Sequence, residues 1–254
     1  MADRSPSLPL FYKQPLPLDR RIHSRSGVPV RTDLSFAALT NSVPLMIGEF
    51  AEAARHYPIL FTPGPEVLPI ALLGLRGDEN LFLDRQGEPE GFCQWRKETY
   101  IPAYVRRYPF ILMETEDADR FALCVDALAL ASTSAGAATP LFTEAGDLND
   151  LGQRASEFCQ QYQGEIVRTR RFTKALADHN LLRDHQATIE LPNGARFNLS
   201  GFQVIDGPAF DQLPDDVFLD WRRQGWLPAI HLHFAASANW RTLIQFTSRD
   251  PAIV

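Results

Sequence analysis

The sequence predicts an α+β fold with an antiparallel β-meander as the core of its first half, and three observations support this. Between residues 59 and 126, short apolar runs bounded by turn residues follow one another, and short strands joined by tight turns pair antiparallel. After residue 141 the apolar residues recur at helical spacing. The composition, 45% hydrophobic and 22% charged, is typical of a globular protein with a sizeable core.

In the first half the pattern favours one helix followed by several strands. The helix has Ser42 as its N-cap and Pro44 in its first turn, and it ends near His56, before Pro58. The strands are expected at residues 59–61, 68–75, 81–83, 110–115 and 120–125. Turns are expected at residues 84–87 and 116–119.

The second half is predicted to contain a helical hairpin, a β-hairpin and C-terminal helices. Residues 148–162 and 166–182 form the helical hairpin, because Gly164 is expected to end the first helix. Residues 187–191 and 196–205 form the β-hairpin through Pro192-Asn-Gly194, since Asn-Gly supplies the positive φ values of a tight turn. A helix over residues 213–223 ends at Gly225, and the chain is helical again beyond Ser237.

Changes in composition divide the chain into three parts. Residues 1–33 are a Pro-rich N-terminal arm, whose apolar side chains we expect to lie on the folded body, because polyproline-like backbone has no internal hydrogen bonds. Residues 34–140 are the sheet-rich half, and residues 141–254 are the helix-rich half with the β-hairpin. One continuous domain over residues 34–250 is the alternative.

The overall composition argues against several classes of function. A net charge of −6 opposes broad binding to nucleic acid or to anionic membranes. The three cysteines lack Cys-x-x-Cys spacing, and no phosphate loop, dinucleotide fingerprint or Gly-x-Ser-x-Gly occurs, so we predict no cofactor. The first residues lack the apolar core of a secretion signal, and no run approaches the roughly 18 apolar residues of a transmembrane segment. We therefore expect a cytoplasmic protein without a membrane span.

The stretch from Tyr100 to Met113 contains the best candidate for a ligand site. Its prolines push the preceding residues, Ile101 and Tyr108, toward extended geometry, so the arginine pair between them lies at a stiff corner. A guanidinium group there can bind a carboxylate or phosphate with two parallel hydrogen bonds, or stack on a tyrosine ring. The alternative is a structural pair that ties a helix end to its neighbours. The ligand-binding candidates are Tyr104, Arg106, Arg107 and Tyr108.

Two further constellations are weaker candidates for chemistry. In an extended backbone, His231-x-His233 places both imidazoles on one side, as in some metal sites, but no acidic residue nearby completes the ligand set, so no metal site is predicted. Asp126 and Asp206 each end an apolar strand, where a carboxylate serves as acid, base or metal ligand, or caps the following turn. The catalytic candidates are Asp126, Asp206 and His233.

Several short motifs occur in a specific order along the chain: Phe36-Ala-Ala, Asn41-Ser-Val-Pro-Leu45, Glu49-Phe50, Tyr57-Pro-Ile-Leu-Phe61, Leu72-Leu-Gly-Leu75, Glu79-Asn-Leu-Phe82, Tyr100 to Phe110, Pro140-Leu-Phe142, Gly201-Phe202 and a terminal segment with His233. Their order resembles the bacterial SapC family, which is distinct from the peptide-transporter permease of the same name. The name refers to paracrystalline surface layers, and the resemblance also implies accessory proteins encoded near TonB-dependent receptors and tryptophan-halogenase-like flavoproteins. This sequence differs in having Asp126-Ala127 and Asp206-Gly207 where relatives tend to have Asp-Glu.

Two hypotheses about function follow. The first is a non-enzymatic accessory or binding protein of a Gram-negative bacterium, linked to the surface layer or to TonB-dependent nutrient uptake. It engages a protein partner or a small anionic ligand, with a homo-oligomer as a further option. The second is an enzyme whose site combines the arginine pair with Asp126, Asp206, His231 and His233 across the two halves, with a metal as an option. An enzyme requires these groups to surround one pocket.

Overall fold

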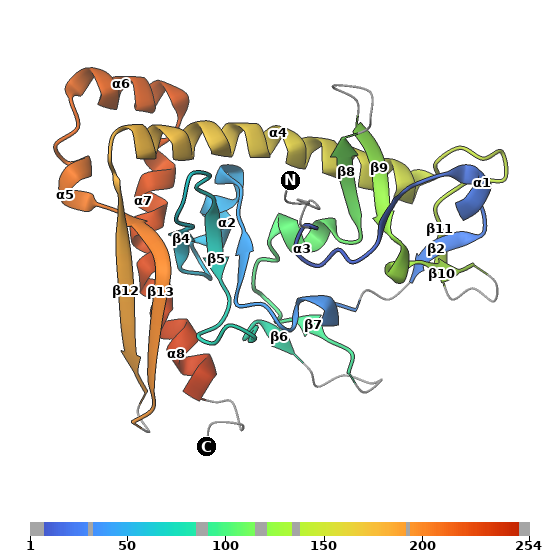
Figure 1. The fold of residues 1–254 in the computed structure, drawn as a ribbon, viewed down its shortest axis with the longest axis horizontal. Coiled ribbons are helices and arrows are strands. Elements are labelled where there is room, and N and C mark those ends of the chain that lie inside the picture. Colours follow the sequence, from blue (N-terminus) through green and yellow to red (C-terminus); the bar gives the residue numbers. More distant parts are fainter. Residues whose placement is uncertain are drawn as a thin grey trace, which may run out of the picture.

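The computed structural model describes residues 8–29, 33–84, 91–114, 121–133, 138–191 and 194–248. Helices and several antiparallel sheets both occur in these ranges, so the predicted α+β class is confirmed. The long helix α4 (Asp150–Asp178) runs along most of the molecule and connects its two ends (Figure 1). The turns expected at 84–87, 116–119 and 192–194 lie largely outside the described residues.

The largest sheet has five strands and combines segments from both halves of the sequence. Its order is β12-β13-β4-β5-β3, and the neighbouring strands are antiparallel. The predicted β-hairpin is confirmed, although β12 begins at Leu182, earlier than expected. The strands are β3 (Ser42–Pro44), β4 (Ile59–Phe61), β5 (Pro69–Leu72), β12 (Leu182–Glu190) and β13 (Arg196–Ile205).

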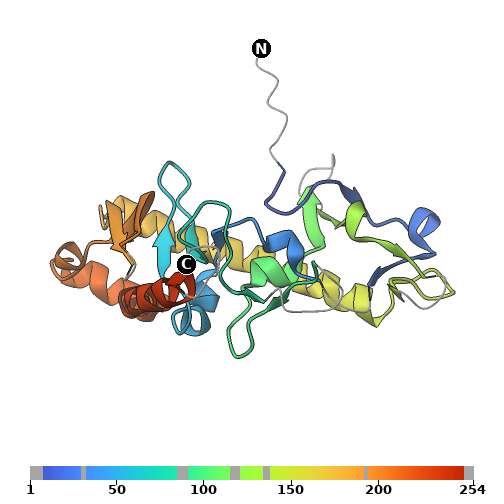
Figure 2. The same cartoon turned by 90° about the horizontal axis from the view of Figure 1, so that it is seen from below.

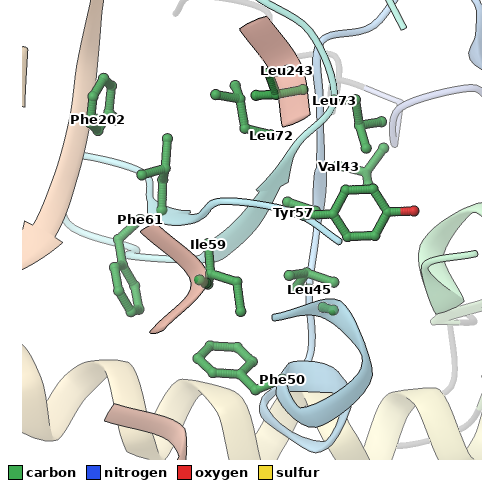
Figure 3. Packing of buried hydrophobic residues seen from close by; sticks show 14 of the residues in the cluster. Val43, Leu45, Phe50, Tyr57, Ile59, Phe61, Leu72, Leu73, Phe202 and Leu243 are labelled. Carbon is green, nitrogen blue, oxygen red and sulfur yellow. The ribbon is translucent and has the colours of Figure 1, made fainter. Parts of the chain in front are cut away.

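The main hydrophobic core surrounds this sheet. Phe61 and Tyr57 are fully buried, and Figure 3 shows them with neighbouring side chains of β3, β5 and helix α2 (Phe50–Ala53). The hydroxyl of Tyr57 donates to the carbonyl of Tyr100 and accepts a hydrogen bond of 2.9 Å from Nε1 of Trp95. These hydrogen bonds therefore connect the core to the segment that leads into Arg106 and Arg107.

The remaining strands lie in smaller sheets, and they do not continue one meander. Strands β8 (Phe110–Glu114) and β9 (Phe121–Asp126) form the expected hairpin, and β9 also pairs with β1 (Pro15–Pro17). Strand β2 (Ser26–Pro29) pairs with β10 (Ala131–Ser132) and β11 (Ala138–Pro140), and β6 (Leu83–Asp84) pairs with β7 (Gln94–Trp95). The described part of the N-terminal arm, which also contains α1 (Arg20–His23), thus adds strands to two sheets. The division into three parts stays a prediction.

The helix expected from Ser42 is wrong, because Ser42–Pro44 is strand β3. The chain turns helical only at η2 (Ile47–Glu49), which leads into the short helix α2. The Glu49 side chain accepts a hydrogen bond of 2.9 Å from the backbone N–H of Met46 and thereby caps this turn. Pairing of Ser42–Pro44 with β5 outweighs the local capping signal.

The predicted helical hairpin is also wrong, because α4 is one continuous helix through Gly164. A glycine inside a helix costs only about 1 kcal/mol relative to alanine. Burial of side chains along the whole helix outweighs this cost, from Cys159 and Tyr162 before the glycine to Phe172 and Leu176 after it. Helix α4 contacts β8, η2 and α3 (Ala103–Arg107).

The C-terminal region is more helical than the sequence predicted. Helix α6 (Asp215–Gln224) ends at Gly225, which has φ of 74°, as expected. The helix predicted beyond Ser237 is confirmed by α8 (Trp240–Ser248), and helical structure also precedes it in α7 (Leu227–Ala236) and η5 (Ser237–Asn239). In the described part of the chain, no helix is long and apolar enough to cross a membrane.

Candidate ligand-binding site

The arginine corner is formed by α3 and the residues that flank it. Pro102 is the N-cap of α3, and the helix ends at Tyr108, which is extended with φ of −60° and ψ of 136°. The predicted restriction of Tyr108 before Pro109 is therefore confirmed. The two arginines occupy the last turn of α3, where Arg106 is exposed and Arg107 is buried.

A buried carboxylate, Glu49, holds this corner in place. Its Oε1 accepts hydrogen bonds from the backbone N–H of Ala103 at 2.6 Å and from the hydroxyl of Tyr100 at 2.9 Å. The Tyr100 hydroxyl in turn accepts from Nη2 of Arg106 at 3.0 Å, and Nε of Arg106 donates to the carbonyl of Ile101 at 2.9 Å. Burial raises the pKa of Glu49, although these hydrogen bonds oppose the rise. Among the described residues, this network does not use Nη1 of Arg106, which can therefore donate to a ligand.

Arg107 lies among aromatic rings and is only 7% exposed. Its guanidinium carbon is 4.5 Å from the ring centroids of both Tyr104 and Tyr162, and 5.6 Å from that of Tyr12. Tyr12 belongs to the N-terminal arm and donates to the carbonyl of Phe110 at 2.6 Å. Cation–π contacts of this kind stabilise a desolvated arginine.

No carboxylate in the described part of the chain neutralises the charge of Arg107. In the described ranges, no carboxylate oxygen lies within 4.0 Å of its guanidinium, and its buried Nε has no hydrogen-bond partner. Burial raises the pKa of Tyr12, Tyr104 and Tyr162, and Arg107 only partly opposes this rise, so the phenols stay uncharged. A buried charge is ordinarily paired.

Both arginines line a cavity of about 810 Å³. Arg154 of α4 contributes a third guanidinium, which also has no carboxylate within 4.0 Å in the described ranges. The rest of the wall is largely apolar and includes Val28, Pro29, Phe36, Phe92, Tyr108, Pro109, Phe110, Leu128, Ala129, Leu130, Ala131, Leu151, Ala155 and Phe158.

The described wall of the cavity contains one carboxylate, that of Asp33, and its oxygens accept hydrogen bonds from groups other than the arginines. It accepts hydrogen bonds from the backbone N–H groups of Ser35 and Cys93 and from the Ser35 hydroxyl, at 3.0, 2.9 and 2.5 Å. Burial raises the pKa of Asp33, but these hydrogen bonds outweigh it and lower the pKa overall. The cavity thus has a surplus of positive charge in a protein whose net charge is −6.

The predicted ligand-binding residues come together, with one in a supporting position. Arg106, Arg107 and Tyr108 line the cavity, whereas Tyr104 packs against Arg107 outside its wall. Tyr104 also donates a hydrogen bond of 3.1 Å to the carbonyl of Leu10 and so fastens the arm.

The two candidate aspartates serve as caps. Asp126 is fully buried, and it accepts hydrogen bonds from the backbone N–H groups of Lys13 at 2.6 Å and Leu128 at 3.1 Å. Asp206 is the N-cap of the short helix α5 (Gly207–Phe210) and lies 3.9 Å from Arg183. Neither lines the arginine cavity.

The histidine pair does not have the arrangement that a metal site on a strand would need. His231 and His233 lie on α7, where residues two positions apart point in very different directions, so the extended geometry on which the weak metal candidate depended does not occur. His233 accepts a hydrogen bond of 3.1 Å from the backbone N–H of Ile205 and lines a separate cavity of about 310 Å³. The two cavities share no lining residue, and α7 lies at one end of the molecule while β8 and β9 lie toward the other (Figure 1, Figure 2). The six groups of the composite enzyme site are therefore not brought together.

Comparison with known proteins gives one result. The SapC family model matches residues 18–243 of the chain. The chain belongs to the SapC family. No curated protein and no solved structure shows a significant match.

Sequence reasoning missed several groups of this SapC site. Arg154, Asp33 and Tyr12 are far from the arginine pair in the sequence, and no local motif marks them. Glu49 has a faint signal, because it stands before Phe50 in a short motif shared with the family resemblance. In the part of the SapC chain that the structure describes, no group of three or more His, Cys, Asp or Glu side chains is arranged to hold a metal ion.

Proposed function

We propose that this SapC protein is a non-enzymatic binding protein for a small organic anion, which enters the cavity lined by Arg106, Arg107 and Arg154. The observation that carries the proposal is Arg107, a 7% exposed arginine without a described carboxylate partner in the wall of a largely apolar cavity. Isolated buried charge is costly unless an opposite charge compensates it. A bound anion supplies that charge.

Two features support a binding site over a purely structural arginine. The cavity of about 810 Å³ is in the range of roughly 300–1,000 Å³ typical of small-molecule sites. The position of Arg106 is fixed by its own hydrogen bonds and, through Tyr100, by Glu49, so little side-chain entropy is lost when a ligand binds. The site is pre-organised before the anion arrives.

The family resemblance gives this activity a setting. An accessory protein that binds an organic anion suits a role beside TonB-dependent nutrient uptake or the surface layer of a Gram-negative bacterium. Because the arginine cavity and the histidine cavity are separate, the proposal does not involve His231, His233 or Asp206.

The proposal is tested with anilinonaphthalene sulfonate, an apolar anion whose fluorescence rises in apolar surroundings. The folded wild-type chain is expected to bind it saturably. Arg107→Met keeps the length of the side chain but removes its charge, and we expect an affinity loss of roughly 10- to 100-fold, as for lost hydrogen bonds to charged groups. Near-UV circular dichroism and the melting temperature report whether each variant is folded.

Arg76→Met is the matched control. Arg76 also lies over an aromatic ring, at 5.7 Å from the centroid of Phe197, but it does not line the arginine cavity. Its substitution is expected to leave binding unchanged. If Arg107→Met does not fold, Arg154→Met on the exposed side of α4 replaces it. Unchanged affinity in folded arginine-cavity variants contradicts the proposal.

A further inference from the structure

The cavity also indicates the chemical class of its ligand, an inference that rests on the proposed function. We propose that the ligand is an apolar carboxylate, in which a carboxylate head binds the arginines and an alkyl or aryl body covers the apolar wall. Three properties of the described wall lead to this class: its hydrogen-bond donors, its apolar area and the scarcity of its other polar groups.

The donors favour a planar head group with two acceptor oxygens. The protein surrounds Arg107 with tyrosine rings, which attract its charge, and the hydroxyls of Tyr12 and Tyr104 accept from its guanidinium, but its buried Nε has no hydrogen-bond partner among the described residues. Nε and Nη2 of Arg106 donate to Ile101 and Tyr100, and Nη1 has no hydrogen-bond acceptor among the described residues. The fork of a guanidinium matches the two oxygens of a carboxylate.

The apolar part of the cavity wall requires that the ligand carry an apolar portion attached to its carboxylate. Phe110, Leu130, Leu151 and Phe158 line the same cavity, and Leu128 beside them is 64% exposed. An inorganic anion contacts only the arginines and leaves this apolar surface in water. Covering it contributes about 0.8 kcal/mol for each buried methylene group. The ligand that uses the whole cavity therefore carries an extended apolar portion.

The scarcity of other polar groups disfavours sugars and nucleotides. The described wall contains no Asn, Gln, Thr, Lys or His side chain. Its polar side chains besides the arginines and Tyr108 are those of Ser35 and Asp33, and these bond to each other. A polyhydroxylated ligand would lose hydrogen bonds to water without replacing them, which is costly for buried hydroxyl groups.

The test measures how carboxylates displace anilinonaphthalene sulfonate from the full-length chain. Across butanoate, hexanoate, octanoate and decanoate we expect affinity to rise roughly fourfold per methylene group until the wall is covered. Octan-1-ol and octanamide are expected to bind at least about tenfold more weakly than octanoate, since they lack the charge. Inorganic phosphate is expected not to displace the dye.

A wall variant with a matched control makes the test specific. Ala155→Leu narrows the cavity and preserves helix propensity, so it is expected to weaken the binding of decanoate more than the binding of butanoate. Ala177→Leu, an exposed position near the other end of α4 and outside this cavity, is expected to change neither.

Specific outcomes overturn the inference. Equal binding of butanoate and decanoate contradicts the apolar body, equal binding of octanol and octanoate contradicts the charged head, and stronger binding of octyl phosphate than octanoate contradicts the carboxylate. In each case, dye binding that still depends on Arg107 leaves the proposed function standing. Loss of that dependence removes the proposed function itself.

Discussion

His233 is expected to make the folded protein sensitive to mild acid. Its side chain is 6% exposed, and Nε2 must be unprotonated to accept the hydrogen bond from the backbone of Ile205. Burial lowers the pKa of His233 from 6.5 to about 4, and a smaller effect of the Ile59 backbone opposes this. Arg183 and His185 line the same cavity, so additional positive charge there is unfavourable.

The size and sign of the effect follow from the two pKa values. Since the pKa in the folded state lies below that of the unfolded state, the unfolded chain takes up the proton first as the pH falls. Stability is therefore lost between about pH 6.5 and pH 4 and is fully present above this window. The complete loss amounts to about 3 kcal/mol, of which about 2 kcal/mol is lost by about pH 5.

Urea unfolding at several pH values measures this loss. Other groups also titrate, so wild type is compared with His233→Gln, whose amide oxygen can accept from Ile205 but does not titrate. Between about pH 8 and pH 5, wild type should lose about 2 kcal/mol more unfolding free energy than the variant. Parallel curves for the two proteins would refute this reasoning.

Three further predictions concern stability, each measured by urea unfolding. Gly164→Ala should stabilise the protein by about 0.5–1 kcal/mol, because the added Cβ meets open space within a helix; a destabilisation would argue for a kink at this position. Asp126→Ala should lower the free energy of unfolding by about 2–4 kcal/mol, because it leaves the backbone N–H groups of Lys13 and Leu128 without an acceptor. A loss below about 0.5 kcal/mol would show that this aspartate does not anchor the N-terminal arm. Tyr57→Phe should cost about 1–3 kcal/mol by leaving the Trp95 indole N–H unpaired, whereas a neutral result would mean that water replaces the hydroxyl.

The parts of the fold that sequence reasoning predicted are governed by local rules. Ile59–Phe61 is a short apolar run between turns and is strand β4, and Asp215–Gln224 has a proline before it and a glycine after it. The failures are positions where distant contacts decide. Gly164 does not end its helix because side chains on both sides of it are buried, and Ser42–Pro44 pairs with a strand that lies later in the chain.

The candidate site was predictable to the same extent. Arg106 and Arg107 are adjacent in the sequence and lie between two prolines, so a local pattern marked them. Arg154 reaches the cavity only because α4 packs against α3, and Tyr12 reaches Arg107 only because the N-terminal arm pairs with β9. His231 and His233 would share a side only in an extended segment, but they lie on a helix, so their spacing in the sequence alone did not decide how their side chains are arranged.

The pairing of β1 with β9 has a consequence for how the chain matures during translation. Residues 15–17 leave the ribosome long before their partners at 124–126, and the large sheet stays incomplete until residue 205 has emerged. Contacts between such distant segments form slowly. Residues 15–17 therefore lack their strand partner until residue 126 has emerged, and a chaperone that shields nascent chains should raise the yield of folded protein.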